Sequence, residues 1–224
     1  MDTNKIGVPA AIVLAGIIIA GAIVYAFAYA PKTPSSAGNN PADVTIPPLT
    51  DADHRIGGAD AELVFVEYSD LECPFCSQFH PVLEQALTEY GGKVAWVFRQ
   101  FPLTQIHPEA LPAAKASECV AKLKGNDAFW AFTSQLYEQQ NSIGTPLYHS
   151  LAGSLGISAT DLDACIADPT IEARIAADYK AAVEAGAQGT PFTVVLNKKG
   201  KTVHVFPGAL QYPQLKAEID TLLK

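Results

Sequence analysis

Two cysteines, Cys73 and Cys76, stand two residues apart in the sequence Cys-Pro-Phe-Cys. They follow an apolar run over residues 63–68 that predicts a buried strand, and they precede residues 77–90, whose apolar side chains recur with helical spacing. A thiol at the start of a helix faces unpaired backbone N–H groups and the positive end of the helix dipole, which stabilise a thiolate. A second thiol one turn further along can close a disulfide with the first or resolve a mixed disulfide. The spacing therefore predicts a redox-active pair, with Cys73 as the nucleophile and Cys76 as the resolving thiol.

Two other functions of this pair were weighed, a purely structural disulfide and half of a zinc site. Zinc would need two further ligands, and the sequence has neither a second CxxC nor a His-x₃₋₅-His pair. We therefore predict no metal site. The formal net charge is −8, from 15 Lys and Arg against 23 Asp and Glu, and no basic block occurs. Because affinity for phosphates needs clustered cations, nucleic acid is not expected as a partner.

The N-terminal residues 6–30 carry no charged side chain and are flanked by Lys5 and Lys32. A helix of this length would cover about 37 Å, which is enough to span a bilayer with some tilt. We predict that residues 1–30 form an uncleaved signal anchor with one transmembrane helix. A cleaved signal peptide is the alternative, because Ala26-Phe27-Ala28 fits the cleavage pattern. Both interpretations place the rest of the chain outside the cytoplasm.

The remaining chain divides into a tether and one folded region. Residues 31–53 contain five prolines and predict an extended tether rather than a packed element. Residues 54–224 predict a strand (63–68), a helix (77–90) kinked at Pro81, a strand (94–98), a helical block at about 105–186, a β-hairpin (192–206) and a last helix (212–223). Within the block, the expected helices are 109–122, 128–139, 147–155, 159–167 and 170–185, with N-caps at Asp127 and at Ser158 or Thr160.

This order of elements resembles an α/β thioredoxin fold with a helical domain inserted in its middle, as in the DsbA-like thiol:disulfide oxidoreductases. The resemblance covers residues 54–224 and rests on the CxxC, on Pro81 five residues beyond Cys76, and on Thr190-Pro191 before the hairpin. It implies an enzyme that introduces disulfides into unfolded, reduced secreted or periplasmic proteins. It also implies regeneration by a membrane partner of the DsbB or vitamin K epoxide reductase type, with no cofactor beyond the redox-active disulfide. The expected location is the bacterial cytoplasmic (inner) membrane, single-pass, with the catalytic domain facing the periplasm or the cell exterior.

The resemblance also assigns further site residues. Strand alternation places Glu67 on the same face as Phe65 and Ser69, and the resemblance suggests that Glu67 is a buried acid relaying protons to Cys76. The alternative is an exposed strand carboxylate. Pro74 and Phe75 are assigned to substrate binding. Thr190 and Pro191 are assigned to a cis-proline loop that faces the dithiol and pairs with an extended substrate.

Some residues depart from the pattern of strong oxidants in this family. Phe75 stands where those enzymes often carry histidine, and Thr190 stands where they often carry valine. A membrane-anchored reductase or isomerase therefore stays open as an alternative, as does a peptide-binding or chaperone module in which the CxxC is incidental. Asp70 and Glu72 are expected to decorate the loop before the dithiol, where the charge of Glu72 would oppose a thiolate at Cys73.

Cys119 and Cys165 lie 46 residues apart on two different predicted helices. We expect a structural disulfide that stabilises the helical block by about 2–4 kcal/mol. Buried free thiols and a second redox relay are the alternatives. The histidines near these motifs are interpreted as surface or packing residues and are left out of the site: His54, His80 and His107.

Overall fold

The computed structural model describes residues 41–224. The predicted anchor over residues 1–30 and the first part of the predicted tether lie outside this range. Within residues 41–224, every helix is too short or too polar to cross a bilayer.

The core of the fold is a five-stranded sheet in the order β1-β3-β2-β4-β5. Its central strands β2 (Leu63–Ser69) and β3 (Val94–Gln100) run parallel, while every other neighbouring pair is antiparallel. Both central strands are buried at every position, which explains why they appear in the sequence as continuous apolar runs. The remaining strands are β1 (His54–Gly57), β4 (Phe192–Asn197) and β5 (Thr202–Phe206).

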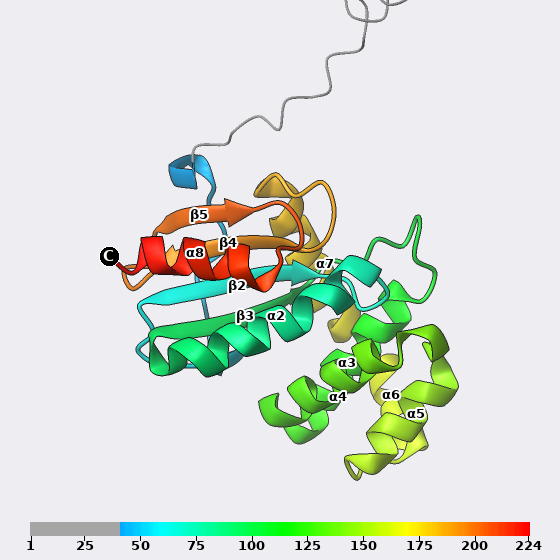
Figure 1. The fold of residues 1–224 in the computed structure, drawn as a ribbon. Coiled ribbons are helices and arrows are strands. Elements are labelled where there is room, and N and C mark those ends of the chain that lie inside the picture. Colours follow the sequence, from blue (N-terminus) through cyan, green and yellow to red (C-terminus); the bar gives the residue numbers. More distant parts are fainter. Residues whose placement is uncertain (1–40) are drawn as a thin grey trace, which may run out of the picture. The chain divides into compact units, whose positions relative to one another are not determined.

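Helices cover both faces of the sheet (Figure 1). Helices α2 (Pro74–Tyr90) and α8 (Tyr212–Leu222) cover one face, and α7 (Pro169–Glu184) covers the other. Strand alternation directs the side chains accordingly: Phe65 joins the α2 core, whereas its neighbours Val64 and Val66 join the core that contains residues of α7.

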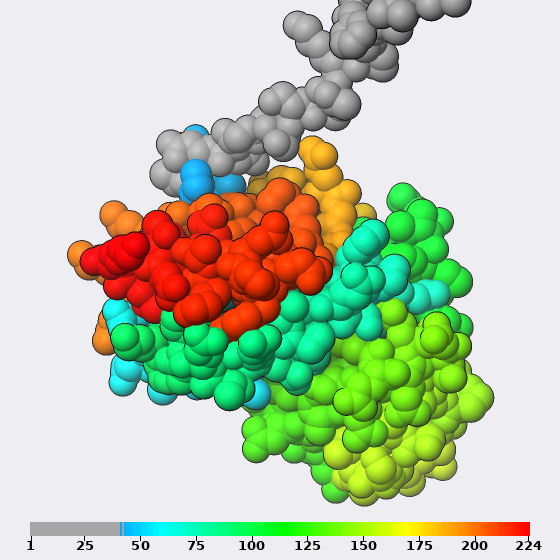
Figure 2. All heavy atoms as spheres, in the orientation of Figure 1, coloured from blue at the N-terminus to red at the C-terminus, as the bar shows by residue number. Residues whose placement is uncertain are grey.

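The helical insertion lies between β3 and β4, as predicted. It contains α3 (Ala110–Lys124), α4 (Asn126–Glu138), α5 (Thr145–Ser154), α6 (Ala159–Ile166) and α7. In Figure 2 the green and yellow-green atoms of this insertion form a block beside the sheet. Short 3-10 turns occur at Pro41–Asp43, Gly91–Lys93 and Gln140–Ser142. The predicted α/β thioredoxin-like fold with a helical insertion is confirmed.

Local details differ from the sequence-based expectations. Strand β1 was not predicted, because it is short and forms only by pairing with β3 at the sheet edge. Asp127 was predicted as the N-cap of its helix, but α4 starts after Gly125 and Asp127 lies in its first turn. Of the two caps proposed for α6, Ser158 is the one used, since its hydroxyl accepts a bond from Asp161 N at 3.1 Å. Helix α2 continues through Pro81 to Tyr90.

The predicted tether is shorter than expected, because its last residues pack against the sheet. Val44 is buried in the core on the α7 side. The buried guanidinium of Arg99 donates to the carbonyl oxygens of Pro47 and Pro48 at 3.2 and 3.3 Å, and to the carboxylate of Asp53 at 2.8 Å. A buried cation requires such partners, so this proline-rich segment belongs to the folded unit.

Candidate active site

The dithiol lies where β2 passes into α2. Cys73 is the N-cap residue of α2 and Pro74 occupies the first helical turn, where its missing N–H is not needed. Both Cys73 and Cys76 are free thiols. Cys73 is nearly buried, since only 3% of its surface is accessible. Its Sγ lies 3.6 Å from the carbonyl oxygen of Thr190, so the Thr190-Pro191 loop covers it.

The two thiols have opposite environments. A hydrogen bond from the Cys76 thiol and the backbone N–H groups of Cys76 and Phe75 lower the pKa of Cys73 to about 6, against the effect of burial. Burial raises the pKa of Cys76 well above its ordinary value, and the neighbouring Cys73 and Glu67 raise it further. Cys73 is therefore suited to be the thiolate and Cys76 the protonated thiol.

Glu67 lies beneath the dithiol on β2 and is almost completely buried. Burial raises the pKa of Glu67 to about 7, against the hydrogen bond from Ser69. The Ser69 hydroxyl donates to Glu67 Oε1 at 2.7 Å and lies 3.0 Å from the hydroxyl of Tyr137. The nearby hydroxyl of Ser69 also acts to lower the pKa of Cys76, against the larger effect of burial. Ser69 thus bonds the acid and influences the resolving thiol.

Ser69 was not predicted as a site residue, and its role can be tested by Ser69→Ala. This change removes the hydroxyl that bonds Glu67 and lowers the pKa of Cys76. Resolution of a mixed disulfide by Cys76 is therefore expected to slow by about tenfold, the value of one buried hydrogen bond. Stopped-flow measurement of the resolution step checks this. Ser77→Ala is the matched control, because the Ser77 hydroxyl bonds the carbonyl of Tyr137 rather than Glu67. Equal rates for the two variants would contradict the role of Ser69.

The helical insertion holds the active-site loop in place. Gln140, just after α4, donates its side-chain N–H groups to the carbonyl oxygens of Leu71 and Cys73 at 3.0 and 3.1 Å. Tyr137 donates to the carbonyl of Asp70 at 3.3 Å. No sequence signal marks Tyr137 or Gln140, because they lie more than sixty residues from the loop that they bind.

The Thr190–Pro191 peptide bond is cis, and this loop lies against Cys73. Pro74 and Phe75 are on the surface, and Phe75 is 60% exposed. The residues assigned to substrate contact therefore surround the entrance to the dithiol. Phe75 provides an apolar rim but no charge for the thiolate.

Asp70 was expected to decorate the loop, but it is buried and fully bonded. Its carboxylate accepts bonds from the backbone N–H groups of Glu72 and Leu103, each at 2.8 Å. The Nδ1 atom of His107 lies 2.8 Å from the same carboxylate. The carboxylate of Glu72 also has a fixed position, since it accepts a bond from Glu109 N at 2.6 Å. Asp70 thus joins the active-site loop to the loop that precedes α3.

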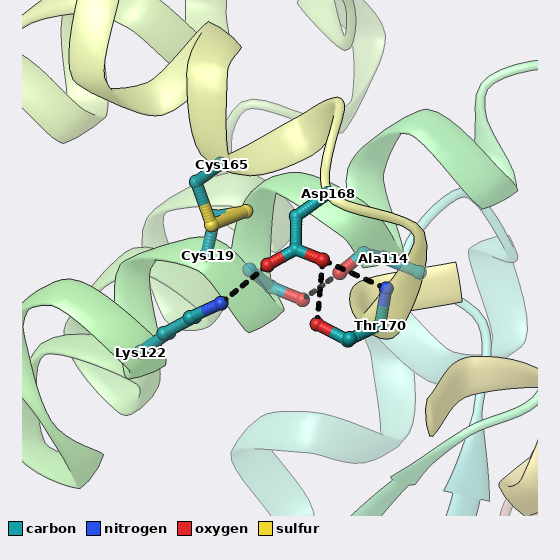
Figure 3. The surroundings of a disulfide bond; sticks show 7 residues. Ala114, Cys119, Lys122, Cys165, Asp168 and Thr170 are labelled. Atoms are coloured by element: carbon teal, nitrogen blue, oxygen red, sulfur yellow. Dashed lines mark hydrogen bonds and ion pairs between the residues drawn. A yellow bond between two sulfur atoms is a disulfide. The ribbon is translucent and has the colours of Figure 1, made fainter. Parts of the chain in front are cut away.

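Cys119 and Cys165 form a disulfide with a Cα–Cα distance of 5.8 Å. It joins α3 to the end of α6 (Figure 3). Close to it, Lys122 Nζ binds Asp168 Oδ2 at 2.6 Å, and Asp168 caps α7 through the N–H of Thr170 at 2.9 Å. The disulfide therefore joins α3 to α6, and the Lys122–Asp168 pair joins α3 to the start of α7. In residues 41–224, no group of three His, Cys, Asp or Glu side chains is placed to bind a metal ion.

Comparisons with known proteins agree with this geometry. A family model described as Thioredoxin matches residues 49–220. A curated relative, the Na(+)/H(+) antiporter NhaA 1 of Mycolicibacterium vanbaalenii, is 32% identical over 194 residues, which are 85% of this chain but 30% of that protein. NhaA 3 of Salinispora tropica is 34% identical over 149 residues, 66% of this chain and 22% of that protein. The chain thus spans less than a third of these relatives, and the transport that their names describe is not attributed to it.

Solved structures give the more informative likeness. DsbA2 of Pseudomonas aeruginosa superposes with a TM-score of 0.66 at 28% identity, covering 78% of this chain and 97% of that one. The catalytic domain of Proteus mirabilis ScsC superposes with a TM-score of 0.64 at 26% identity, covering 78% and 90%. The chain therefore belongs to the thioredoxin family, and its likeness is to the DsbA-like and ScsC-like thiol:disulfide oxidoreductases.

Proposed function

We propose that this chain is an extracytoplasmic thiol:disulfide oxidoreductase that introduces disulfides into secreted or periplasmic proteins. The observation that carries the proposal is the unequal placement of two free thiols within one helical turn. Cys73 stands at the helix N-terminus beneath the Thr190-Pro191 loop, whereas Cys76 is buried above Glu67. A stabilised thiolate at Cys73 favours the reduced enzyme, which makes the Cys73–Cys76 disulfide an oxidant.

The reaction follows from these positions. A substrate thiolate attacks Cys73 Sγ, the Cys73–Cys76 bond breaks, and its electron pair goes to Cys76. The protonated carboxyl of Glu67 supplies the proton that Cys76 then takes up. A second substrate thiolate attacks the substrate sulfur of the mixed disulfide, and Cys73 leaves as a thiolate. The substrate loses two electrons and two protons. The enzyme takes up both electrons and leaves the reaction with a thiolate at Cys73 and a thiol at Cys76; one proton restores Glu67 and the other goes to solvent.

Renewed oxidation requires an electron acceptor outside this chain. We propose a membrane partner of the DsbB or vitamin K epoxide reductase type, reached because residues 1–30 anchor the protein in the cytoplasmic membrane. Recovery of the full-length protein in the membrane fraction after carbonate extraction is the expected result. Its complete release into the soluble fraction would overturn the anchor.

The same geometry also fits a reductase or isomerase, since thiol–disulfide exchange runs in either direction. Phe75 and Thr190 keep this second function open, because neither residue supplies the features of the strongest oxidants. A non-catalytic peptide-binding module is the alternative from a different class, and the exposed ring of Phe75 is the feature that fits it.

One experiment separates these functions: equilibration of the purified protein with glutathione, combined with oxidative refolding of a reduced substrate. If the protein is an oxidant, we expect a reduction potential of about −120 mV and rapid disulfide formation. A reduction potential of about −270 mV would overturn the oxidant function. Protein whose Cys73 and Cys76 thiols have been alkylated is the control. If the alkylated protein assists refolding as well as the free enzyme does, the function is peptide binding and not redox chemistry.

Phe75→His tests whether the apolar residue between the cysteines limits the oxidising power. A protonated imidazole beside Cys73 is expected to stabilise its thiolate further, which shifts the glutathione equilibrium toward the dithiol by about tenfold, or about 30 mV. Phe75→Leu controls for the loss of the ring. Identical potentials for both variants and the unaltered protein would show that this position does not set the potential.

A further inference from the structure

His107 lies on the loop between β3 and α3, which runs beside the start of α2 (Figure 1). The loop has a fixed conformation, because the N–H groups of Ile106 and His107 both bond the carbonyl of Leu103 at 3.0 Å. Leu103 in turn donates its own N–H to Asp70. The imidazole is therefore held against a carboxylate three residues before the nucleophilic cysteine.

Asp70 poses an electrostatic problem for the dithiol. Its carbonyl oxygen accepts the bond from Cys73 N at 3.1 Å, so its carboxylate belongs to the same turn as the thiol. The Asp70 side chain is buried, where a negative charge is weakly screened and opposes formation of a thiolate nearby. Unlike Phe75, which carries no charge, His107 is placed to cancel this effect.

We propose that His107 is a positioning residue of the redox centre, whose positive charge neutralises Asp70 and thereby stabilises the Cys73 thiolate. The imidazolium cancels a negative charge near Cys73, whereas a histidine between the two cysteines would add a positive one. The inference deepens the proposed function, since it concerns the same nucleophile. It rests on the geometry of the Asp70–His107 pair and on Cys73 being the thiolate.

The charged groups that face His107 all favour its protonated form. Burial lowers the pKa of His107, but the bond and the charge of Asp70 outweigh it, and Cys73 and Glu72 raise the pKa further. The net result is a pKa above the ordinary value of histidine. Coupling between two titrating groups is reciprocal, so a thiolate that favours the imidazolium is itself favoured by it. The support is present below the raised pKa of His107 and is lost as the pH rises through it.

Glu72, the other acid next to Cys73, is held differently. Its carboxylate is bound by the N–H of Glu109, whose side chain accepts a bond from the hydroxyl of Tyr148 at 2.9 Å. No histidine or lysine pairs with Glu72 among the salt bridges of residues 41–224. His107 is thus the cationic side chain that the active-site loop engages through Asp70.

The test uses the full-length reduced protein with His107→Gln, and follows the ultraviolet absorbance of the Cys73 thiolate during a pH titration. The thiolate fraction near pH 6 is expected to fall by about two- to fivefold. The glutathione equilibrium is expected to move toward the disulfide by about three- to tenfold. His149→Gln is the matched control, because His149 also pairs with an aspartate, Asp163 at 2.7 Å, on the exposed surface of the insertion. That variant is expected to titrate like the unaltered protein.

His107→Lys keeps a positive charge at every relevant pH, and it is expected to restore most of the thiolate fraction. A purely structural role would lower the stability of His107→Gln without moving the titration of Cys73, and that result would overturn the proposal. The proposal would also be overturned if the Cys73 thiolate titrated identically in His107→Gln, His107→Lys and His149→Gln. These readouts need no substrate, so failure of the refolding assay described above would overturn the oxidase function while leaving this inference intact.

Discussion

Replacing Glu67 by glutamine is expected to slow the proton-coupled step at Cys76 by about a hundredfold, the usual contribution of a positioned acid or base. Glutamine keeps the shape of the side chain and an oxygen that accepts the bond from Ser69, but it cannot donate a proton to Cys76 or accept one from it. Stopped-flow measurement of the reaction with a reduced peptide checks this. Glu62→Gln is the control, because Glu62 is exposed and immediately precedes the same strand.

The same variant is expected to be more stable than the unaltered protein above neutral pH. The folded-state pKa of Glu67 is about 7 against an ordinary value of 4.5. Between these values the unfolded chain releases a proton that the folded chain retains, so stability falls as the pH rises from about 4.5 to about 7. The full effect is about 3 kcal/mol, and glutamine removes it. Urea unfolding of the reduced protein should give equal stabilities near pH 4 and a more stable variant near pH 8.

Glu67→Gln thus separates chemistry from stability. If the variant reacts as fast as the unaltered protein across the whole pH range, Glu67 is not the proton donor. If its stability shows the same pH dependence as that of the unaltered protein, Glu67 is not the group that retains the proton. The first result would require another proton donor for Cys76, and the second would require another buried group that retains a proton in the folded state.

Removing the Cys119–Cys165 disulfide is expected to cost about 3–4 kcal/mol in the free energy of unfolding. The bridge closes a loop across a sequence separation of 46 residues, and a cross-link of that length restricts the unfolded chain by about this amount. For a folded unit of this size the melting temperature of Cys119→Ala/Cys165→Ala should fall by about 6–16 °C. Thermal unfolding followed by circular dichroism checks this.

A second measurement separates the effect of the disulfide on stability from the effect of the two alanine side chains. In a Cys73→Ser/Cys76→Ser background a reductant acts on Cys119–Cys165 alone, because these are the four cysteines of the chain. Reduction of that protein should lower its melting temperature nearly as much as the double alanine variant does. An unchanged melting temperature in both experiments would show that the bridge contributes nothing to stability.

Loss of the Cys119–Cys165 disulfide is expected to lower activity as well as stability. Tyr137 and Gln140 lie between the two bridged cysteines in the sequence, and both bond the active-site loop. Loosening the insertion therefore loosens the groups that hold Asp70 and the carbonyl of Cys73. The Cys119–Cys165 disulfide is in this way coupled to the loop that carries Cys73.

The sequence was sufficient for strands β2 to β5 of the sheet and for the helical insertion, but not for β1. Glu67 and Ser69 could be placed on one face because side chains along a strand alternate, and the structure puts them in contact. The central strands were recognisable because burial on both faces leaves continuous apolar runs. In each case the signal is local in the chain.

Features that depend on distant residues were missed. An aspartate in a loop is usually exposed, so the sequence gives no sign that Asp70 is buried. Its burial depends on Leu103 and His107, which lie more than thirty residues later in the chain. The packing of residues 44–53 depends likewise on Arg99, since a proline-rich segment has carbonyl groups free to accept bonds from a buried guanidinium. No local pattern reports such pairings.

The packed segment also fixes where the chain enters the folded unit. The carbonyl of Val44 accepts a bond from the hydroxyl of Thr202 at 2.7 Å, at the first residue of β5. Strand pairing puts that residue beside the start of β2, whereas Cys73 follows the end of β2, about 20 Å away along the strand. Val44 therefore lies at the end of the sheet opposite to the dithiol.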